Sequence, residues 1–128
     1  MKKILIIDDD RPLAELLGMF LTTFGYPPPV YAGDGNDGLF VLIQENIGVI
    51  FTDLEMPNMD GETFIKNYRN STQAFARVIL MSGQFSPNDD FLALAKQYNV
   101  DAVLSKPFLP HRVLDALTIA GIRPNMFK

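Results

Sequence analysis

Five short apolar runs alternate along this chain with longer amphipathic stretches. Strands are predicted for the apolar runs, which cover residues 4–7, 30–32, 49–52, 78–81 and 102–104. Helices are predicted for the amphipathic stretches, which cover residues 10–24, 36–45, 61–70, 88–98 and 110–120. An unbroken apolar run such as 4–7 is typical of a strand that is covered on both faces. The alternation therefore predicts a single α/β domain, a doubly wound (βα)5 fold around a five-stranded parallel sheet.

Local signals mark the ends of several predicted helices. Asp10 is the expected N-terminal cap of the first helix, and Gly25 is its expected end. Asp60 is an expected helix cap rather than a metal ligand. In the fourth helix, Asp89 and Asp90 are expected in the first turn, where negative charge is favourable.

Polar side chains gather where the predicted strands end. The first strand is followed by Asp8 and Asp9, the third by Asp53, the fourth by Ser82 and the fifth by Lys106. In an open parallel sheet the functional crevice lies beyond the carboxyl ends of the strands, so these groups should meet at one edge. A pair of carboxylates ~4 Å apart repels by about 4 kcal/mol at an effective dielectric of about 20. An ammonium group and a hard divalent cation, Mg²⁺ or Mn²⁺, would offset that repulsion.

Such a site suits phosphoryl transfer, because a carboxylate beside a metal, an ammonium group and a hydroxyl donor is well placed to attack phosphorus. Each residue also has a simpler interpretation. Asp8, Asp9 and Asp10 could be a helix-capping cluster, and Ser82 could be an ordinary strand end. His111, the one histidine of the chain, is interpreted as a surface residue rather than a base.

Composition narrows the classes of partner. The chain has 128 residues and a formal net charge of −4, which argues against nucleic acid, because phosphate binding needs a basic face. It has no cysteine, so disulfides, thiolate zinc sites and cysteine nucleophiles are excluded. The apolar run at residues 4–7 is too short for an export signal or a membrane span. We expect a cytoplasmic protein whose partners include neither nucleic acid nor a membrane.

Taken in order, these motifs resemble the receiver domains of two-component response regulators. The resemblance rests on residues 4–9, 53–61, 81–83 and 106–108, and it spans essentially the whole chain. It implies one receiver domain over residues 1–128, with a flavodoxin-like fold and a strand order of 2-1-3-4-5. It also implies a phosphoacceptor signalling switch that changes its affinity for a downstream protein, not an enzyme that acts on other substrates.

The resemblance further implies a metal site. Asp53 would accept the phosphoryl group from a sensor histidine kinase or a phosphotransfer protein, with Mg²⁺ as cofactor and Mn²⁺ as a possible substitute. Asp9 and Asp53 would bind the metal directly, and Asp8 would act mainly through metal-bound water. The backbone carbonyl of Glu55 would be a further ligand.

Other residues near this site receive roles from the resemblance. Lys106 would pair with Asp53 and later with the phosphoryl oxygens, and its peptide bond to Pro107 would be cis. Ser82 would hydrogen-bond to the phosphoryl group. Two further positions, Glu55 and Gln84, are predicted to set the rate of autodephosphorylation because they adjoin the path of the attacking water.

One position departs from the family pattern. Many receivers carry Tyr or Phe three residues before the lysine, where this chain has Val103. A swing of an aromatic ring between buried and exposed positions cannot occur there, so the switch mechanism stays open. The sequence also leaves open whether this is a stand-alone regulator or a receiver from a longer protein.

Three other functions are compatible with parts of the pattern. A phosphatase of the haloacid dehalogenase type would use Asp53 as its nucleophile, but this chain has Glu55 where a second Asp is expected. A flavodoxin-like cofactor binder would need a loop rich in Ser, Thr and Gly after the first strand. A degenerate receiver acting only as an interaction module would not retain the full set of site residues.

Overall fold

The computed structural model describes residues 2–71 and 74–128, and within them strands and helices alternate as predicted. The strands are β1 (Lys3–Ile7), β2 (Val30–Ala32), β3 (Ile47–Asp53), β4 (Arg77–Ser82) and β5 (Ala102–Ser105). The α-helices are α1 (Arg11–Thr23), α2 (Gly35–Gln44), α3 (Gly61–Arg69), α4 (Phe91–Tyr98) and α5 (Pro110–Ile119). A short 3-10 helix, η1 (Pro124–Phe127), follows α5.

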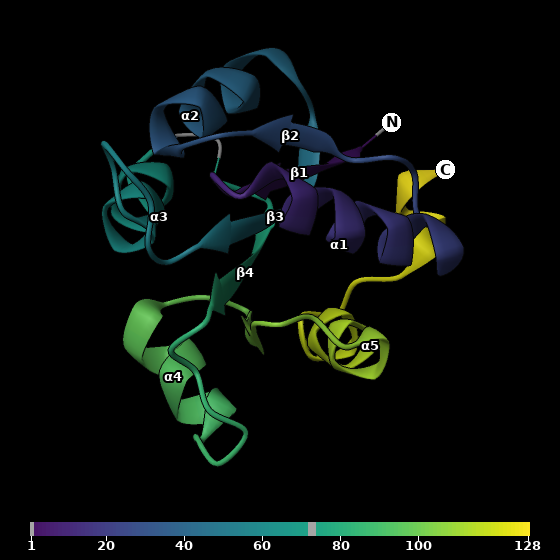
Figure 1. Ribbon diagram of the computed structural model, residues 1–128. Coiled ribbons are helices and arrows are strands. Elements are labelled where there is room, and N and C mark those ends of the chain that lie inside the picture. The colour runs from purple at the N-terminus through teal and green to yellow at the C-terminus, as the bar shows by residue number, and fades with distance from the viewer. Residues whose placement is uncertain (1, 72–73) are drawn as a thin grey trace.

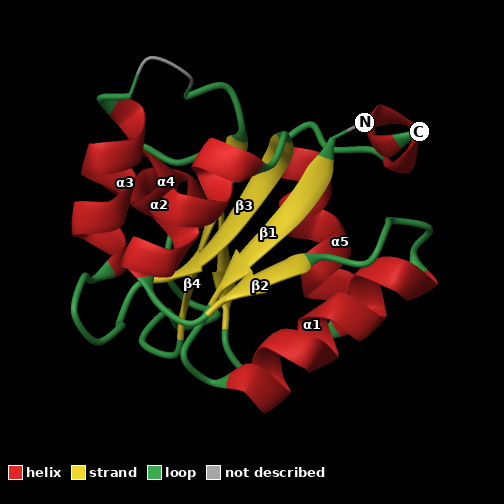
Figure 2. Ribbon diagram, turned by 90° about the horizontal axis from the view of Figure 1, so that it is seen from above, coloured by secondary structure: helices red, strands yellow, loops and turns green. Residues whose placement is uncertain are grey.

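The strands form one parallel sheet in the order β2-β1-β3-β4-β5, which confirms the order implied by the family resemblance (Figure 1). Helices α1 and α5 cover one face of this sheet, and α2, α3 and α4 cover the other (Figure 2). In β1, Ile4 and Ile6 belong to the core under the first pair of helices, whereas Leu5 and Ile7 belong to the core under the other three. Burial on both faces explains why this strand is an unbroken apolar run.

Several helix ends follow the signals in the sequence. The Asp10 carboxylate accepts a hydrogen bond from the Leu13 backbone N–H at 3.2 Å and so caps α1. The Asp60 carboxylate caps α3 in the same way, with the Thr63 backbone N–H at 2.8 Å. Gly25 follows α1 with a φ of 95°, a left-handed conformation that glycine adopts without steric strain. These three expectations are confirmed.

The start of α4 is a correction. The helix begins at Phe91, and Asp90 is its N-terminal cap, so neither Asp89 nor Asp90 lies in the first turn. The reason is a local turn that competes with the helix. Its hydrogen bonds run from the Asp89 backbone N–H to the Ser86 carbonyl, at 2.9 Å, and from the Ser86 backbone N–H to the Asp89 carboxylate, at 2.7 Å.

The other boundary errors are small. The helix α2 begins at Gly35 rather than at residue 36, because the Asp34 carboxylate caps it. The strand β3 begins at Ile47, two residues before the predicted start, since pairing with β1 continues there from Lys3. None of these shifts changes which residues lie at the carboxyl edge of the sheet.

The 3-10 helix η1 was not predicted, because four residues are too few to show a helical period. It places Phe127 in the core, where the side chain is 4% exposed. The ring of Phe127 packs edge-on against that of Tyr26, with 5.7 Å between the centroids. The segment therefore closes the same end of the domain as the turn that follows α1.

We predict that Phe127→Ala lowers the free energy of unfolding by about 3 kcal/mol, because it leaves a cavity beside Tyr26. Urea unfolding followed by circular dichroism measures this change. Met126→Ala is the matched control: this neighbouring side chain is 41% exposed, so a loss of no more than about 0.5 kcal/mol is expected. Equal losses in the two variants would contradict the packing role of Phe127.

Candidate functional site

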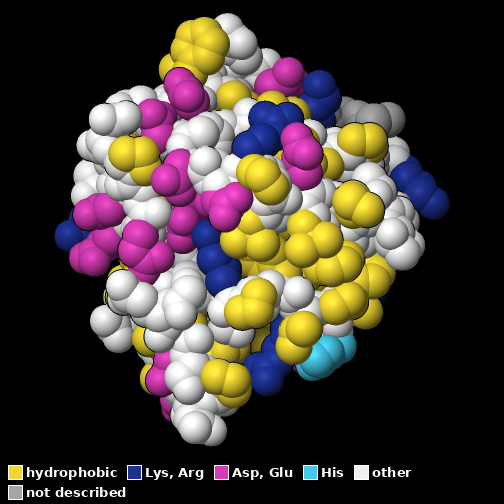
Figure 3. All heavy atoms as spheres, viewed as in Figure 1, with side chains coloured by type: hydrophobic (Ala, Val, Ile, Leu, Met, Phe, Trp, Pro, Cys, Tyr) yellow, Lys and Arg dark blue, Asp and Glu magenta, His cyan; other side chains and the backbone are white. Residues whose placement is uncertain are grey.

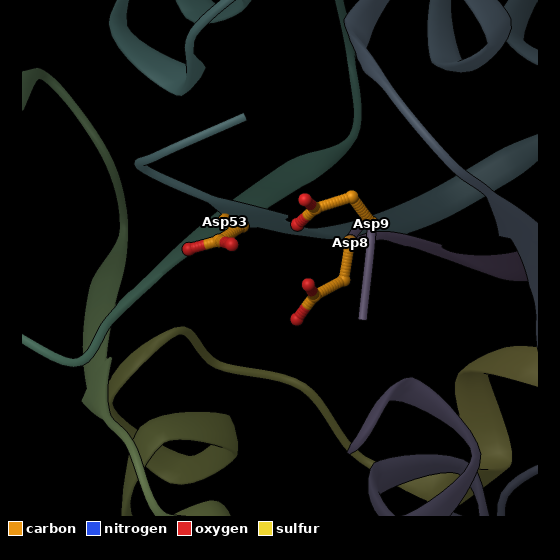
Figure 4. Close-up of side chains that lie close together, drawn as sticks. All are labelled: Asp8, Asp9 and Asp53. Atoms are coloured by element: carbon orange, nitrogen blue, oxygen red, sulfur yellow. The ribbon is translucent and has the colours of Figure 1, made fainter. Parts of the chain in front are cut away.

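Three carboxylates meet where β1 and β3 end (Figure 4). Asp8 and Asp9 directly follow β1, and Asp53 is the last residue of β3. One oxygen atom of each lies within 4.8 Å of an oxygen of the others. The strand order explains this grouping, because β1 and β3 are parallel neighbours and their carboxyl ends lie side by side.

Lys106 joins two of these carboxylates from the loop after β5. Its Nζ atom lies 2.8 Å from Asp8 Oδ2 and 3.1 Å from Asp53 Oδ2. Its side chain is only 15% exposed, so the ion pairs are largely shielded from water. The Lys106–Pro107 peptide bond is cis, as expected. One ammonium group therefore balances part of the negative charge of two buried acids.

Ser82 lies at the end of β4, the other neighbour of β3, and is fully buried. The pairing of Asp53 with Met81 places Ser82 one residue farther along at the same edge of the sheet. Its hydroxyl donates a hydrogen bond to Glu55 Oε1 at 2.8 Å and accepts one from the Gln84 backbone N–H at 3.0 Å.

The pKa of Asp53 reflects this crowding. Burial raises it most, the ammonium group of Lys106 lowers it, and the charges of Asp8 and Glu55 raise it; the net result is a pKa of about 6 in place of 3.8. The balance at Lys106 is the reverse. Burial alone would lower its pKa, but the hydrogen bond to Asp8 and the charges of Asp53 and Asp8 raise it above 10.5. Lys106 is therefore protonated at neutral pH.

The residues at this edge fit a hard cation. Asp53 Oδ1 is buried and receives no hydrogen bond from the residues that the structure describes. Asp9, by contrast, is exposed, so the cluster is reachable from solvent. An oxygen-only set with one buried acceptor left without a donor is what Mg²⁺ or Mn²⁺ would satisfy.

The model of the response regulator receiver domain family matches residues 4–118. The chain belongs to this family. This receiver domain is a phosphoacceptor of two-component signalling, and a signalling switch rather than a conventional enzyme. Receiver domains of two-component systems interact with histidine kinases and downstream targets.

Relatives of the receiver domain agree with this assignment. It is 30% identical over 116 residues to a probable chemotaxis protein CheY of Rhizobium etli, covering 90% of this chain and 88% of that protein. Its fold matches the chemotaxis response regulator CheY4 of Vibrio cholerae with a TM-score of 0.78 and 28% identity, over 94% of this chain and 98% of that chain. The receiver domain of the Francisella response regulator 1452 matches with a TM-score of 0.76 and 25% identity, over the same shares of the two chains.

Two other residues singled out in the sequence are not members of the carboxylate cluster. His111 is exposed on α5, as interpreted, and Val103 is buried in β5. Across residues 2–71 and 74–128, no helix is both long and apolar enough to span a membrane. The contact between the side chains of Ser82 and Glu55 was not predicted, because the family resemblance assigns a role to the backbone carbonyl of Glu55 and says nothing of this hydrogen bond.

Gly61, at the start of α3, has a specific role that the sequence does not reveal. A Cβ atom here would overlap the carbonyl oxygen of Asp53 and lie 2.9 Å from Leu54 Cα. Both are backbone atoms, which cannot yield as a flexible side chain would. The glycine is therefore needed for α3 to approach the end of β3 closely.

We predict that Gly61→Ala destabilises the receiver domain by about 2 kcal/mol, although alanine is the better helix former. Chemical unfolding measures this loss. Gly83→Ala is the control, since no heavy atom lies within 4 Å of the position that a Cβ atom would take there. A Gly61→Ala variant as stable as the parent would show that the β3–α3 connection has room for a side chain.

The raised pKa of Asp53 gives a second prediction. Because its pKa in the folded state, about 6, exceeds the ordinary 3.8, the stability that this group supports at low pH is lost as the pH rises through 6. Asparagine cannot ionise, so in EDTA the free energy of unfolding of Asp53→Asn, relative to that of the parent, should grow by about 2 kcal/mol as the pH rises from about 4 to about 7.5. Unfolding curves at each pH measure this gain. Asp60→Asn is the control: a hydrogen bond from the Thr63 backbone N–H lowers the pKa of Asp60, so it should show no such gain.

Proposed function

We propose that Asp53 accepts a phosphoryl group from a sensor histidine kinase or a phosphotransfer protein, with Mg²⁺ bound beside it. The observation that carries the proposal is the state of its two oxygens. Oδ2 is paired with Lys106 at 3.1 Å, while the buried Oδ1 has no hydrogen-bond donor among the described residues. In the transfer, a carboxylate oxygen of Asp53 bonds to phosphorus as the bond from phosphorus to the donor breaks.

The acidic cluster would hold the metal. Asp9 and Asp53 would bind it directly, Asp8 would contribute mainly through bound water, and the backbone carbonyl of Glu55 would be a further ligand. When bound, Mg²⁺ supplies positive charge that neutralises the phosphoryl oxygens, and Mn²⁺ has the same preference for oxygen ligands. The short distances among these carboxylates support this assignment.

Lys106 and Ser82 would stabilise the phosphorylated state. The ammonium group of Lys106 already contacts Asp53, so it is within reach of a phosphoryl group attached there. A hydrogen bond between a charged donor and an anionic oxygen is among the stronger ones in proteins. Ser82, on the adjacent strand, would donate its hydroxyl proton to a phosphoryl oxygen. In this sense the domain would catalyse only its own phosphorylation and dephosphorylation.

The surface suits protein partners rather than nucleic acid. On the face in Figure 3, acidic side chains gather on the left, and apolar side chains cover much of the right, the side where Figure 1 shows α1 and α5. Exposed apolar residues of these two helices include Leu16, Met19 and Leu114. Apolar patches of this kind mark protein contacts. We propose a cytoplasmic receiver domain over residues 1–128 that binds a kinase and a downstream protein, but neither nucleic acid nor a membrane.

Acetyl phosphate with Mg²⁺ tests the phosphoacceptor. Intact mass spectrometry should show a gain of a single phosphoryl group in the parent, and no gain in Asp53→Ala or in the parent with EDTA. Asp60→Asn is the control: this exposed residue caps α3 as aspartate, and asparagine caps equally well, so the gain should persist.

Two outcomes would contradict the proposal. Repeated turnover of small phosphomonoesters would indicate a phosphatase of the dehalogenase type. A phosphoryl group retained by Asp53→Ala would place the acceptor elsewhere.

A further inference from the structure

We propose that the Glu55 carboxylate competes with the phosphoryl group for the one proton of the Ser82 hydroxyl, and so weakens phosphoryl capture at Asp53. The proposal rests on the phosphoacceptor function above. It assigns to the side chain of Glu55 a role separate from that of its backbone carbonyl. Glu55 would thereby set how easily the phosphorylated state forms.

The hydrogen-bond inventory of Ser82 is the basis of the competition. A serine hydroxyl has one proton to donate and two lone pairs that accept. One lone pair receives the Gln84 backbone N–H at 3.0 Å, and the proton is directed to Glu55 Oε1 at 2.8 Å. Ser82 is fully buried, so it cannot turn freely to water. To donate to a phosphoryl oxygen, the hydroxyl must first leave Glu55.

The hydrogen bond from Ser82 to Glu55 can be broken because of where Glu55 lies. Glu55 lies on the loop between β3 and α3, and its side chain is exposed, so the carboxylate can move into water when Ser82 releases it. Because water can solvate the released carboxylate, the net contribution of this bond is modest. Removing the bond should therefore tighten phosphoryl capture by about 5-fold to 10-fold, not by orders of magnitude.

The charge of Glu55 acts in the same direction and must be separated from the competition for the proton. Burial is the main reason for the raised pKa of Asp53, but the negative charge of Glu55 adds to it. That charge would also repel an anionic phosphoryl group. Repulsion persists when Ser82 is replaced by alanine, whereas competition for its proton does not. A double-mutant cycle on Glu55 and Ser82 distinguishes the two effects.

The experiment measures binding of beryllofluoride, a phosphoryl analogue, with Mg²⁺ by isothermal titration calorimetry. Four proteins complete the cycle: the parent, Glu55→Ala, Ser82→Ala and the double variant. Glu62→Ala, which removes an exposed carboxylate at the start of α3, is the control for general charge. Glu55→Ala should bind the probe about 5-fold to 10-fold more tightly than the parent, and Glu62→Ala should change its affinity less than about 2-fold.

In the Ser82→Ala background the gain from Glu55→Ala should fall to about 2-fold or less, since no hydroxyl proton remains to be released. An equal gain in beryllofluoride affinity in both backgrounds would mean that Glu55 acts only by charge repulsion, and it would overturn the proposal. The absence of any gain would overturn it as well. These results differ from a failure of the proposed function. If the parent did not bind beryllofluoride at all, the proposed role of Asp53 as phosphoacceptor would be contradicted, and the role of Glu55 that depends on it would be contradicted too.

Discussion

The ammonium group of Lys106 lies between two buried carboxylates, 2.8 Å from Asp8 and 3.1 Å from Asp53, and the site depends on this arrangement. The two acids are brought together by the pairing of β1 with β3, which also buries much of the apolar core. The packing that stabilises the fold thus forces like charges into proximity. Lys106 relieves part of this repulsion, yet the pKa of Asp53 stays raised, mainly because the carboxyl group is buried and further because Asp8 and Glu55 are negatively charged.

The same crowding extends into the loop after β3. Gly61 allows the start of α3 to approach the Asp53 carbonyl, and its N–H donates a hydrogen bond to the Leu54 carbonyl at 2.8 Å. This tight connection holds Glu55 near Ser82 on the neighbouring strand. Charge, close backbone packing and a hydroxyl donor therefore meet at this one edge of the sheet.

Much of this architecture follows from local sequence. The (βα)5 alternation, the two aspartate caps and Gly25 depend on interactions within a few residues, and the sequence predicts them correctly. The predicted start of α4 is wrong because two local patterns, a helix turn and the Ser86–Asp89 turn, compete for the same residues. The helix η1 is too short to show a helical period, and its Phe127 is held by Tyr26, which is distant in the sequence.

From sequence alone, the order of the strand ends placed Asp8, Asp9, Asp53, Ser82 and Lys106 at one edge, because parallel strands share the direction of their carboxyl ends. Only the tertiary structure decided how these groups divide their bonds. Lys106 bridges Asp8 and Asp53, Ser82 turns to Glu55, and Asp53 Oδ1 has no donor among the described residues. Which partner each group takes depends on differences of a few tenths of an ångström in the distances between side chains that are far apart in the sequence. Hydrophobic periodicity carries no information about such differences.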